Sequence, residues 1–201
     1  TKLEQWTAMY RSPKSIDAPA GSNHGIASLA GVVKARGHEM DLWHVCEKLE
    51  PLPTQAEIVD YVRKTKPGIV GFSVLSIQYD WVVEASKAIR AAFPDLKQII
   101  GGVHCTMVPD EVHESRLFDY VCIGEGDYAL RDVMDALEKG GDPTTVPGIR
   151  CFRDGEKVVN PVAPFPGLDT LPDLDYEVFD MPSILQQTKG WMGILTSRGC
   201  P

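Results

Sequence analysis

Three loops rich in glycine, serine and acidic side chains carry the residues of this sequence best suited to hold a ligand. They contain Ser73, Leu75 and Ser76 in the first loop, Gly101, Gly102 and His104 in the second, and Gly124, Glu125 and Gly126 in the third. Paired glycines let a backbone pass close to a large group and tolerate positive φ, while serine, histidine and glutamate offer hydrogen bonds. This chemistry suits a flat ligand with polar edges. The alternative is that Gly101 and Gly102 form only a tight turn.

Each loop follows a short apolar segment of the kind expected for a buried strand. Residues 69–72 are a continuous apolar run, Ile99 and Ile100 precede the diglycine, and residues 120–123 precede the third loop. Continuous apolar runs are typical of strands covered on both faces. Residues 40–45 alternate between apolar and polar side chains, which predicts another strand.

Helical patterns separate the predicted strands. Apolar side chains recur at helical spacing from Gly25 onwards, and Gly37 is suited to end that helix. Thr54 and Glu57 have the spacing of a capping box, which predicts the start of a second helix. We expect further helices over residues 80–93, 109–115 and 127–139.

Strands that alternate with helices predict an α/β fold with a doubly wound parallel sheet, of the flavodoxin or Rossmann type. Right-handed crossovers place every strand-to-helix loop at one edge of such a sheet, where ligands bind beyond the carboxyl ends of the strands. The opening strand is not evident, because residues 3–10 contain no clear apolar run. We therefore expect the first strand to be missing or degenerate.

The pattern changes after Pro147. Residues 149–153 and 156–159 flank Asp154-Gly155, which predicts a hairpin with a type I′ turn. Residues 160–183 are rich in proline and acidic residues and indicate an ordered linker, and residues 191–196 are expected to form a new strand. The predicted division is a ligand-binding domain at 1–145, a hairpin and linker at 146–190, and the start of another unit at 191–201.

Composition excludes several classes of protein. A net charge of −8 argues against a nucleic-acid partner, no apolar run is long enough to span a bilayer, and we expect no signal peptide. None of the five cysteines forms a Cys-x-x-Cys pair, which argues against a zinc site or a disulfide framework and favours a reducing cytoplasm. Cys46, Cys122 and Cys151 are expected in the core, whereas Cys200 lies in a polar terminal segment.

Four stretches resemble the cobalamin-binding domain that precedes the barrel in cobalamin-dependent radical S-adenosylmethionine enzymes. Residues 71–75, Gly-Phe-Ser-Val-Leu, resemble the Ser-x-Leu loop of that family, and residues 101–104, Gly-Gly-Val-His, resemble its diglycine loop. Residues 119–127 resemble its Phe-Asp-x-Val-x-x-Gly-Glu-Gly segment. Residues 168–172 followed by Ser-Arg-Gly-Cys-Pro at 197–201 resemble its linker and the entry to its radical barrel.

The resemblance implies cobalamin as cofactor, with its nucleotide tail between the Ser73 and Gly101 loops and with the loop residues named above as the binding set. It implies that Cys200 is the first of three cysteines, spaced Cys-x-x-x-Cys-x-x-Cys, which hold a 4Fe-4S cluster that binds S-adenosylmethionine. The second cysteine is not in this sequence, so we expect a fragment without catalytic residues of its own. The parent enzyme would then contain a radical barrel domain and perform methyl transfer, cyclisation or a rearrangement.

The sequence lacks the Asp-x-His-x-x-Gly motif that supplies a cobalt ligand in classical cobalamin domains, as radical enzymes of this family commonly do. His24 lies near the corresponding place and is a candidate cobalt ligand, although a role in a surface loop or helix cap is the alternative. Two other classes compete: a non-catalytic flavodoxin-like binding or regulatory domain, and a corrinoid carrier without a barrel. A receiver domain needs acidic strand ends, where this chain has serine and glycine, and the Ser-Arg-Gly-Cys-Pro ending disfavours a carrier.

Overall fold

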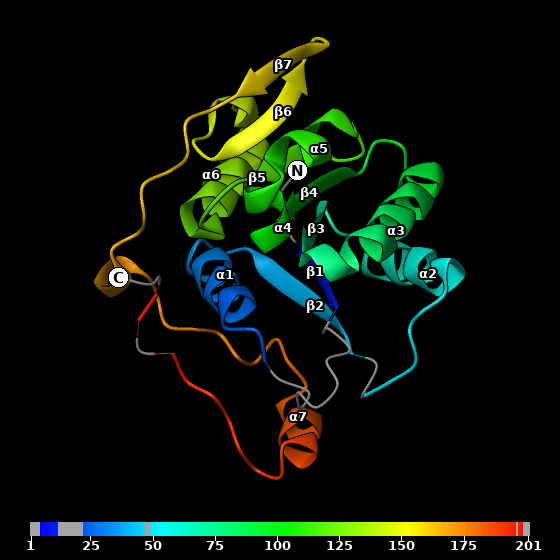
Figure 1. Cartoon of the computed structure of the whole chain (residues 1–201), viewed down its shortest axis with the longest axis vertical. Coiled ribbons are helices and arrows are strands. Elements are labelled where there is room, and N and C mark those ends of the chain that lie inside the picture. Colours follow the sequence, from blue (N-terminus) through cyan, green and yellow to red (C-terminus); the bar gives the residue numbers. More distant parts are fainter. Residues whose placement is uncertain (1–4, 12–21, 47–48, 196, 199–201) are drawn as a thin grey trace.

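The computed structural model describes residues 5–11, 22–46, 49–195 and 197–198, with residues 5–11 described by their backbone alone. They contain one seven-stranded sheet in the order β2-β1-β3-β4-β5-β6-β7 (Figure 1). The strands are β1 (Gln5–Arg11), β2 (Glu39–Val45), β3 (Ile69–Ser73), β4 (Lys97–Gly101), β5 (Tyr120–Cys122), β6 (Ile149–Arg153) and β7 (Glu156–Val159). The first five pair in parallel, and β6 and β7 pair antiparallel. The predicted α/β parallel sheet is confirmed.

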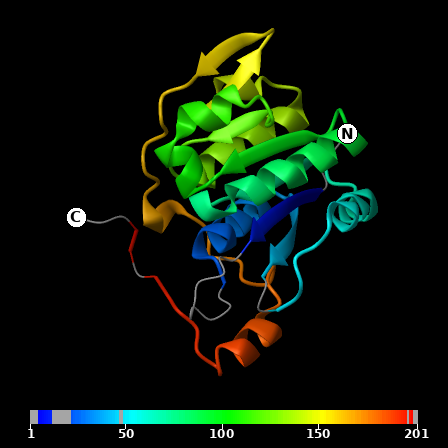
Figure 2. The same cartoon turned by 45° about the vertical axis from the view of Figure 1, so that its right-hand side comes forward.

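Helices cover both faces of this sheet (Figures 1 and 2). The helices are α1 (His24–Ala35), α2 (Gln55–Thr65), α3 (Tyr79–Ala92), α4 (Val103–Met107), α5 (Pro109–Glu114), α6 (Gly126–Lys139) and α7 (Met181–Gln187), with short 3-10 turns at Ser76–Gln78, Pro143–Thr145 and Leu168–Thr170. Helices α1 and α6 share a core cluster with Ile69 and Ile99, while α2 and α3 pack with Val70 and Phe72. Alternate residues of a strand point to opposite faces, so the apolar run in β3 supplies both cores.

Local sequence explains where the helices begin. The predicted capping box forms: the Thr54 hydroxyl accepts from the backbone N–H of Glu57, and the Glu57 carboxylate accepts from the N–H of Thr54. The Asn23 side chain caps α1 by accepting from the N–H of Ile26. No described helix is long and apolar enough to cross a membrane.

The first strand is present, which agrees with the second of our two alternatives, a strand whose sequence pattern is degenerate. Residues Gln5–Arg11 form β1, which lies between β2 and β3 and pairs with both. A central strand is positioned by hydrogen bonds on both sides, so it forms without the long apolar run that we sought in the sequence.

The predicted hairpin forms and extends the sheet. Asp154 and Gly155 both have positive φ, 51° and 84°, as a type I′ turn requires. Strand β6 pairs with β5 through Arg150 and Ile149, so the hairpin continues the parallel sheet with an antiparallel edge. The strand predicted at 191–196 is wrong for the described residues 191–195, which have no regular structure and no strand paired with them. A strand without a partner leaves its backbone hydrogen-bonding groups unsatisfied.

The proline-rich segment after the hairpin packs closely on α1 and contains a helix, α7, that we did not predict. The N–H of Asp175 donates to the carbonyl of Ala27 at 2.9 Å, and Phe179 and Ile184 form a buried cluster with Ile26. Gly31 of α1 faces the carbonyl of Asp173 so closely that a Cβ atom there would overlap it. The linker is therefore part of the packed structure.

Substituting Gly31→Ala is expected to lower the free energy of unfolding by about 1–3 kcal/mol, the usual cost of overpacking. Alanine stabilises most helix positions relative to glycine, so a loss would report the contact with Asp173. Urea unfolding measures the change. The control is Gly141→Ala, where the nearest atoms to a new Cβ lie at 3.5 Å. Equal stability of the two variants would contradict close packing of the linker on α1.

Candidate functional site

A pocket of about 480 Å³ lies at the carboxyl ends of β3, β4 and β5. Seven of the nine predicted loop residues line it: Ser73, Leu75, Gly101, Gly102, Gly124, Glu125 and Gly126. Apolar side chains from α1, α6 and the sheet complete its walls, including Leu29, Leu130 and Phe72. The register pairs Ser73 with Gly101, which brings the first two loops side by side as expected from a parallel sheet. The structure thus brings the three loops together around one cavity.

The first two loops are hydrogen-bonded to each other. The N–H of Val74 donates to the carbonyl of Gly101 at 3.0 Å, and the N–H of His104 donates to the carbonyl of Val74 at 3.2 Å. Gly102 lies between them with φ of 103°, and a Cβ atom there would lie 2.8 Å from both the nitrogen and the oxygen of Val74. A glycine is required at this position by the approach of two backbones, in addition to any requirement of a ligand.

The third loop is tied to the second by Thr106, a residue that our sequence reasoning missed. Its hydroxyl accepts from the N–H of Gly124 at 3.0 Å and donates to the carbonyl of Gly102 at 3.2 Å. Gly124 has φ of 81°, and a Cβ atom on Gly126 would lie 3.2 Å from the Leu29 side chain. The glycines therefore let the loops and α1 close around the pocket. A threonine four residues after the diglycine is the sequence signal that could have identified this bridge.

Ser76 and His104 lie behind the pocket wall, outside the residues that line it. The Nδ1 atom of His104 is 3.0 Å from the hydroxyl of Ser76, and its ring packs on Tyr79 with centroids 4.2 Å apart. Next to them, the buried side chain of Gln78 accepts from the N–H of Leu75 at 2.7 Å. These contacts position the first loop without placing Ser76 or His104 in the lining of the pocket.

His24 is the first residue of α1 and is not among the residues that line the pocket. Its Nδ1 atom lies 2.5 Å from the hydroxyl of Tyr176, and the two rings meet edge to face. Tyr176 belongs to the linker, so this histidine joins α1 to the segment that covers it. Cys200 lies outside the described residues.

The electrostatics of the pocket are concentrated at the start of α6. Glu125 precedes that helix, Asp127 lies in its first turn, and both accept hydrogen bonds from Arg198. The hydrogen bond to Asp127 raises the pKa of Arg198 above its usual value. Burial raises the pKa of the Cys122 thiol, which also lines the pocket, to about 12, so this side chain is a neutral, weakly polar surface.

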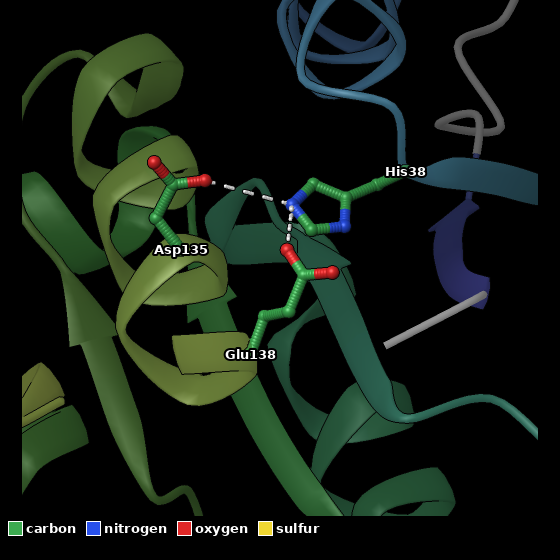
Figure 3. Close-up of side chains that lie close together, drawn as sticks. All are labelled: His38, Asp135 and Glu138. Atoms are coloured by element: carbon green, nitrogen blue, oxygen red, sulfur yellow. Dashed lines mark ion pairs between the residues drawn. The ribbon is translucent and has the colours of Figure 1, made fainter. Parts of the chain in front are cut away.

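A second group of polar side chains lies near the start of β2, at the end of the strands opposite to the pocket (Figure 3). The Nε2 atom of His38 is 3.7 Å from Asp135 and 3.8 Å from Glu138, both on α6. These are residue types that bind metals. Asp135, however, also pairs with Arg36 and Lys139; although burial opposes it, these hydrogen bonds lower the pKa of Asp135 to about 2. Because two cations already compensate this carboxylate, we assign the group an electrostatic role between β2 and α6.

Substituting Gly102→Ala is expected to lower the free energy of unfolding by about 1–3 kcal/mol, because alanine is strained at positive φ and its Cβ would overlap Val74. Gly101→Ala is the matched control: its Cβ would lie 3.3 Å from that of Cys122, and its φ is not positive. Chemical denaturation of both variants gives the comparison. If Gly101→Ala proved the more damaging, the approach to Val74 would not be the reason for the diglycine.

Comparison with known proteins identifies relatives of this chain. The curated relatives include an uncharacterized methyltransferase of Pyrococcus horikoshii, 27% identical over 191 residues, which cover 94% of this chain and 40% of the relative. Another is the anaerobic magnesium-protoporphyrin IX monomethyl ester cyclase of Cereibacter sphaeroides, 23% identical over 88% of this chain and 29% of the relative. The chain thus spans well under half the length of these relatives.

Solved structures share the fold. The cobalamin-dependent S-adenosylmethionine radical enzyme OxsB, with aqua-cobalamin and S-adenosylmethionine bound, matches with a TM-score of 0.79 and 23% identity over 98% of this chain and 27% of its own. The radical S-adenosylmethionine methyltransferase TsrM of Kitasatospora setae, with cobalamin and a [4Fe-4S] cluster bound, matches with a TM-score of 0.66 and 16% identity over 89% of this chain and 32% of its own.

A family model agrees with both sets of matches. The model described as the B12 binding domain matches residues 19–134. That span contains all three loops, α1 and the start of α6, which together form most of the pocket. More than half of the chain is matched, and the protein belongs to the B12 binding domain family.

Proposed function

We propose that the pocket between the β3 and β4 loops holds the nucleotide tail of cobalamin. The observation that carries this assignment is the cavity of about 480 Å³ at the carboxyl ends of the parallel strands, bordered by Ser73, Gly101 and Gly102. Its volume lies within the range of small-molecule sites, and its walls are mostly apolar with few polar groups, as such sites usually are. The residues present therefore fit the cofactor of the family.

The lining residues have distinct roles in this proposal. Ser73 is the polar group at the end of β3 and offers its hydroxyl to a polar atom of the buried tail, which otherwise would lose a hydrogen bond. Leu29 and Leu130 bury the apolar part of the tail. Glu125 lies at the rim, where its carboxylate can accept from a ribose hydroxyl while it pairs with Arg198. Ser76 and His104 hold the first loop in place.

We infer that the parent enzyme is a cobalamin-dependent radical S-adenosylmethionine enzyme, a methyltransferase or a cyclase. The support is the resemblance of residues 197–201 to the start of the radical barrel, together with the names of the relatives. Cobalamin supplies methyl-transfer or radical chemistry when bound. In this proposal Cys200 is the first ligand of a 4Fe-4S cluster, and residues 1–145, 146–190 and 191–201 are the cobalamin domain, the hairpin with its linker, and the entry to the barrel.

We place the protein in the cytoplasm. Cys46, Cys105, Cys122 and Cys151 are buried free thiols, which fit a reducing compartment.

The assignment predicts that the protein retains an equimolar amount of hydroxocobalamin through a desalting column, with a visible corrin spectrum. Substituting Ser73→Phe fills the pocket and is expected to weaken binding by about tenfold or more, equivalent to about 1.4 kcal/mol. Ala56→Phe, on the exposed face of α2, is the control and should bind normally. Folded but colourless protein would contradict cobalamin binding. Equal affinity in the two variants would place cobalamin elsewhere.

The bridge made by Thr106 gives a further prediction. Thr106→Val keeps the shape of the side chain but removes the hydroxyl that joins Gly102 to Gly124, so the rim should loosen. A net hydrogen bond is worth roughly 0.5–1.5 kcal/mol, which predicts a loss of hydroxocobalamin affinity of about two- to tenfold. Spectroscopic titration measures it. The matched control is Thr145→Val, whose hydroxyl donates to the carbonyl of Asp142. An affinity unchanged by Thr106→Val would show that the bridge does not shape the site.

A further inference from the structure

Arg198 makes a set of contacts that neither the family match nor the resemblance assigns. Its Nη1 group donates to Glu125 at 2.9 Å and to Asp127 at 2.6 Å, and its Nη2 group donates to the hydroxyl of Ser28 at 2.6 Å. Ser28 in turn donates to Asp127 at 2.5 Å. One side chain near the end of the sequence thus joins α1 to the start of α6, across a sequence separation of 71 residues to Asp127.

The partner of this arginine is a buried carboxylate. The Asp127 side chain is 3% exposed and that of Arg198 is 26% exposed. A buried carboxylate is costly unless a positive charge and hydrogen bonds compensate it. Among the described residues, the Asp127 carboxylate accepts side-chain hydrogen bonds from Ser28 and Arg198. The cobalamin domain therefore obtains this counter-charge from the segment at 197–198, which the sequence had assigned to the next unit.

Arg198 also lines the pocket, where it could instead pair with an anionic group of the ligand. The geometry favours the internal role. Nη1 is occupied by Glu125 and Asp127, and Nη2 by Ser28 with Asp127 at 3.4 Å. Both ends of the guanidinium fork are therefore engaged within the protein, in the two-pronged manner that gives arginine–carboxylate pairs their geometric specificity.

In the described residues just before Arg198, few contacts fix the chain to the rest of the structure. Residues 191–195 have no regular structure, and Trp191, Ile194 and Leu195 are exposed. We propose that Arg198 is a positioning residue, a latch that fastens the segment leading to Cys200 onto the pocket wall at Asp127 and Ser28. This rests on the proposed function in one respect: if Cys200 binds a cluster, the latch sets the distance between that cluster and the cobalamin pocket. The existence of the latch itself does not depend on cobalamin.

Limited trypsin digestion of the 201-residue chain, followed by mass spectrometry, tests the latch. Trypsin cuts after Lys189 and after Arg198, and both bonds are followed by glycine. Within the part of the chain that the structure describes, Lys189 forms no ion pair, so its cleavage is the internal reference. We expect slow cleavage after Arg198, and we expect Asp127→Asn to accelerate it by about tenfold while cleavage after Lys189 stays unchanged, because cutting follows the population of the open segment.

Asp132→Asn is the matched control, since Asp132 lies on the same helix and pairs with Arg131 at the surface. Should Asp127→Asn lower the melting temperature so far that both sites open, Arg198→Lys gives the answer. Lysine preserves the charge and the trypsin site but has a single side-chain nitrogen, so it cannot reproduce the two-pronged contacts that Nη1 and Nη2 make with Asp127 and Ser28, and cleavage after residue 198 should again accelerate. Equal cleavage after residue 198 in the unmodified chain and in Arg198→Lys would overturn the latch.

The digestions contain no cobalamin. A protein that fails to retain hydroxocobalamin but shows the accelerated cleavage contradicts the proposed function and supports the latch. A protein that retains hydroxocobalamin but shows no acceleration supports the proposed function and overturns the latch.

Discussion

The close approach of two backbones, Gly102 against Val74, is the constraint on which the pocket depends. Register in the parallel sheet sets Ser73 beside Gly101, and the loops that follow must diverge or bond to each other. They bond, through the N–H of Val74 and the carbonyl of Val74, and only a residue without a Cβ atom fits between. The loops are thus satisfied by each other before any ligand arrives. A cavity with such walls is pre-formed, which reduces the ordering cost of binding.

The charge distribution explains which part of a ligand suits this cavity. Glu125 and Asp127 are acidic, but both pair with Arg198. The positive charge of Arg198 therefore compensates part of their negative charge at this end of the pocket. The remaining walls are mostly aliphatic or aromatic side chains, glycine backbone and a neutral Cys122 thiol, with the uncharged polar side chains of Asn23, Ser73 and Thr106. Such walls offer burial to a flat, uncharged ring and hydrogen bonds at its edges, and little attraction to a strongly anionic group. In the proposed cobalamin site, the compensation by Arg198 would favour an uncharged ring over an anionic group at this end of the pocket.

Much of the fold could be predicted from local patterns, because the relevant signals are contiguous in the sequence. The run at 69–72 becomes β3, the capping box at Thr54 starts α2, and Asp154-Gly155 forms the predicted turn. What sequence reasoning missed depends on partners distant in the sequence. Strand β1 is defined by β2 and β3 on either side, and α7 by a cluster with α1. The strand expected at 191–195 fails for the same reason, since no described strand pairs with it.

The candidate site shows the same contrast between signals that are local in the sequence and contacts between distant residues. The glycines were identified because a glycine pair directly after an apolar run is visible in the sequence itself, whereas the contacts of Arg198 and Thr106 join residues from different loops and helices. Ser28 from α1, Asp127 from α6 and Arg198 from the far end of the sequence meet at one wall of the pocket. The burial of the Asp127 carboxylate depends on Arg198, because without the arginine Asp127 would be an uncompensated buried charge. The stability of the pocket is therefore coupled to that of the segment that leads to Cys200. A domain boundary between residues 190 and 191 would separate two parts of the chain that the ion pair between Asp127 and Arg198 joins.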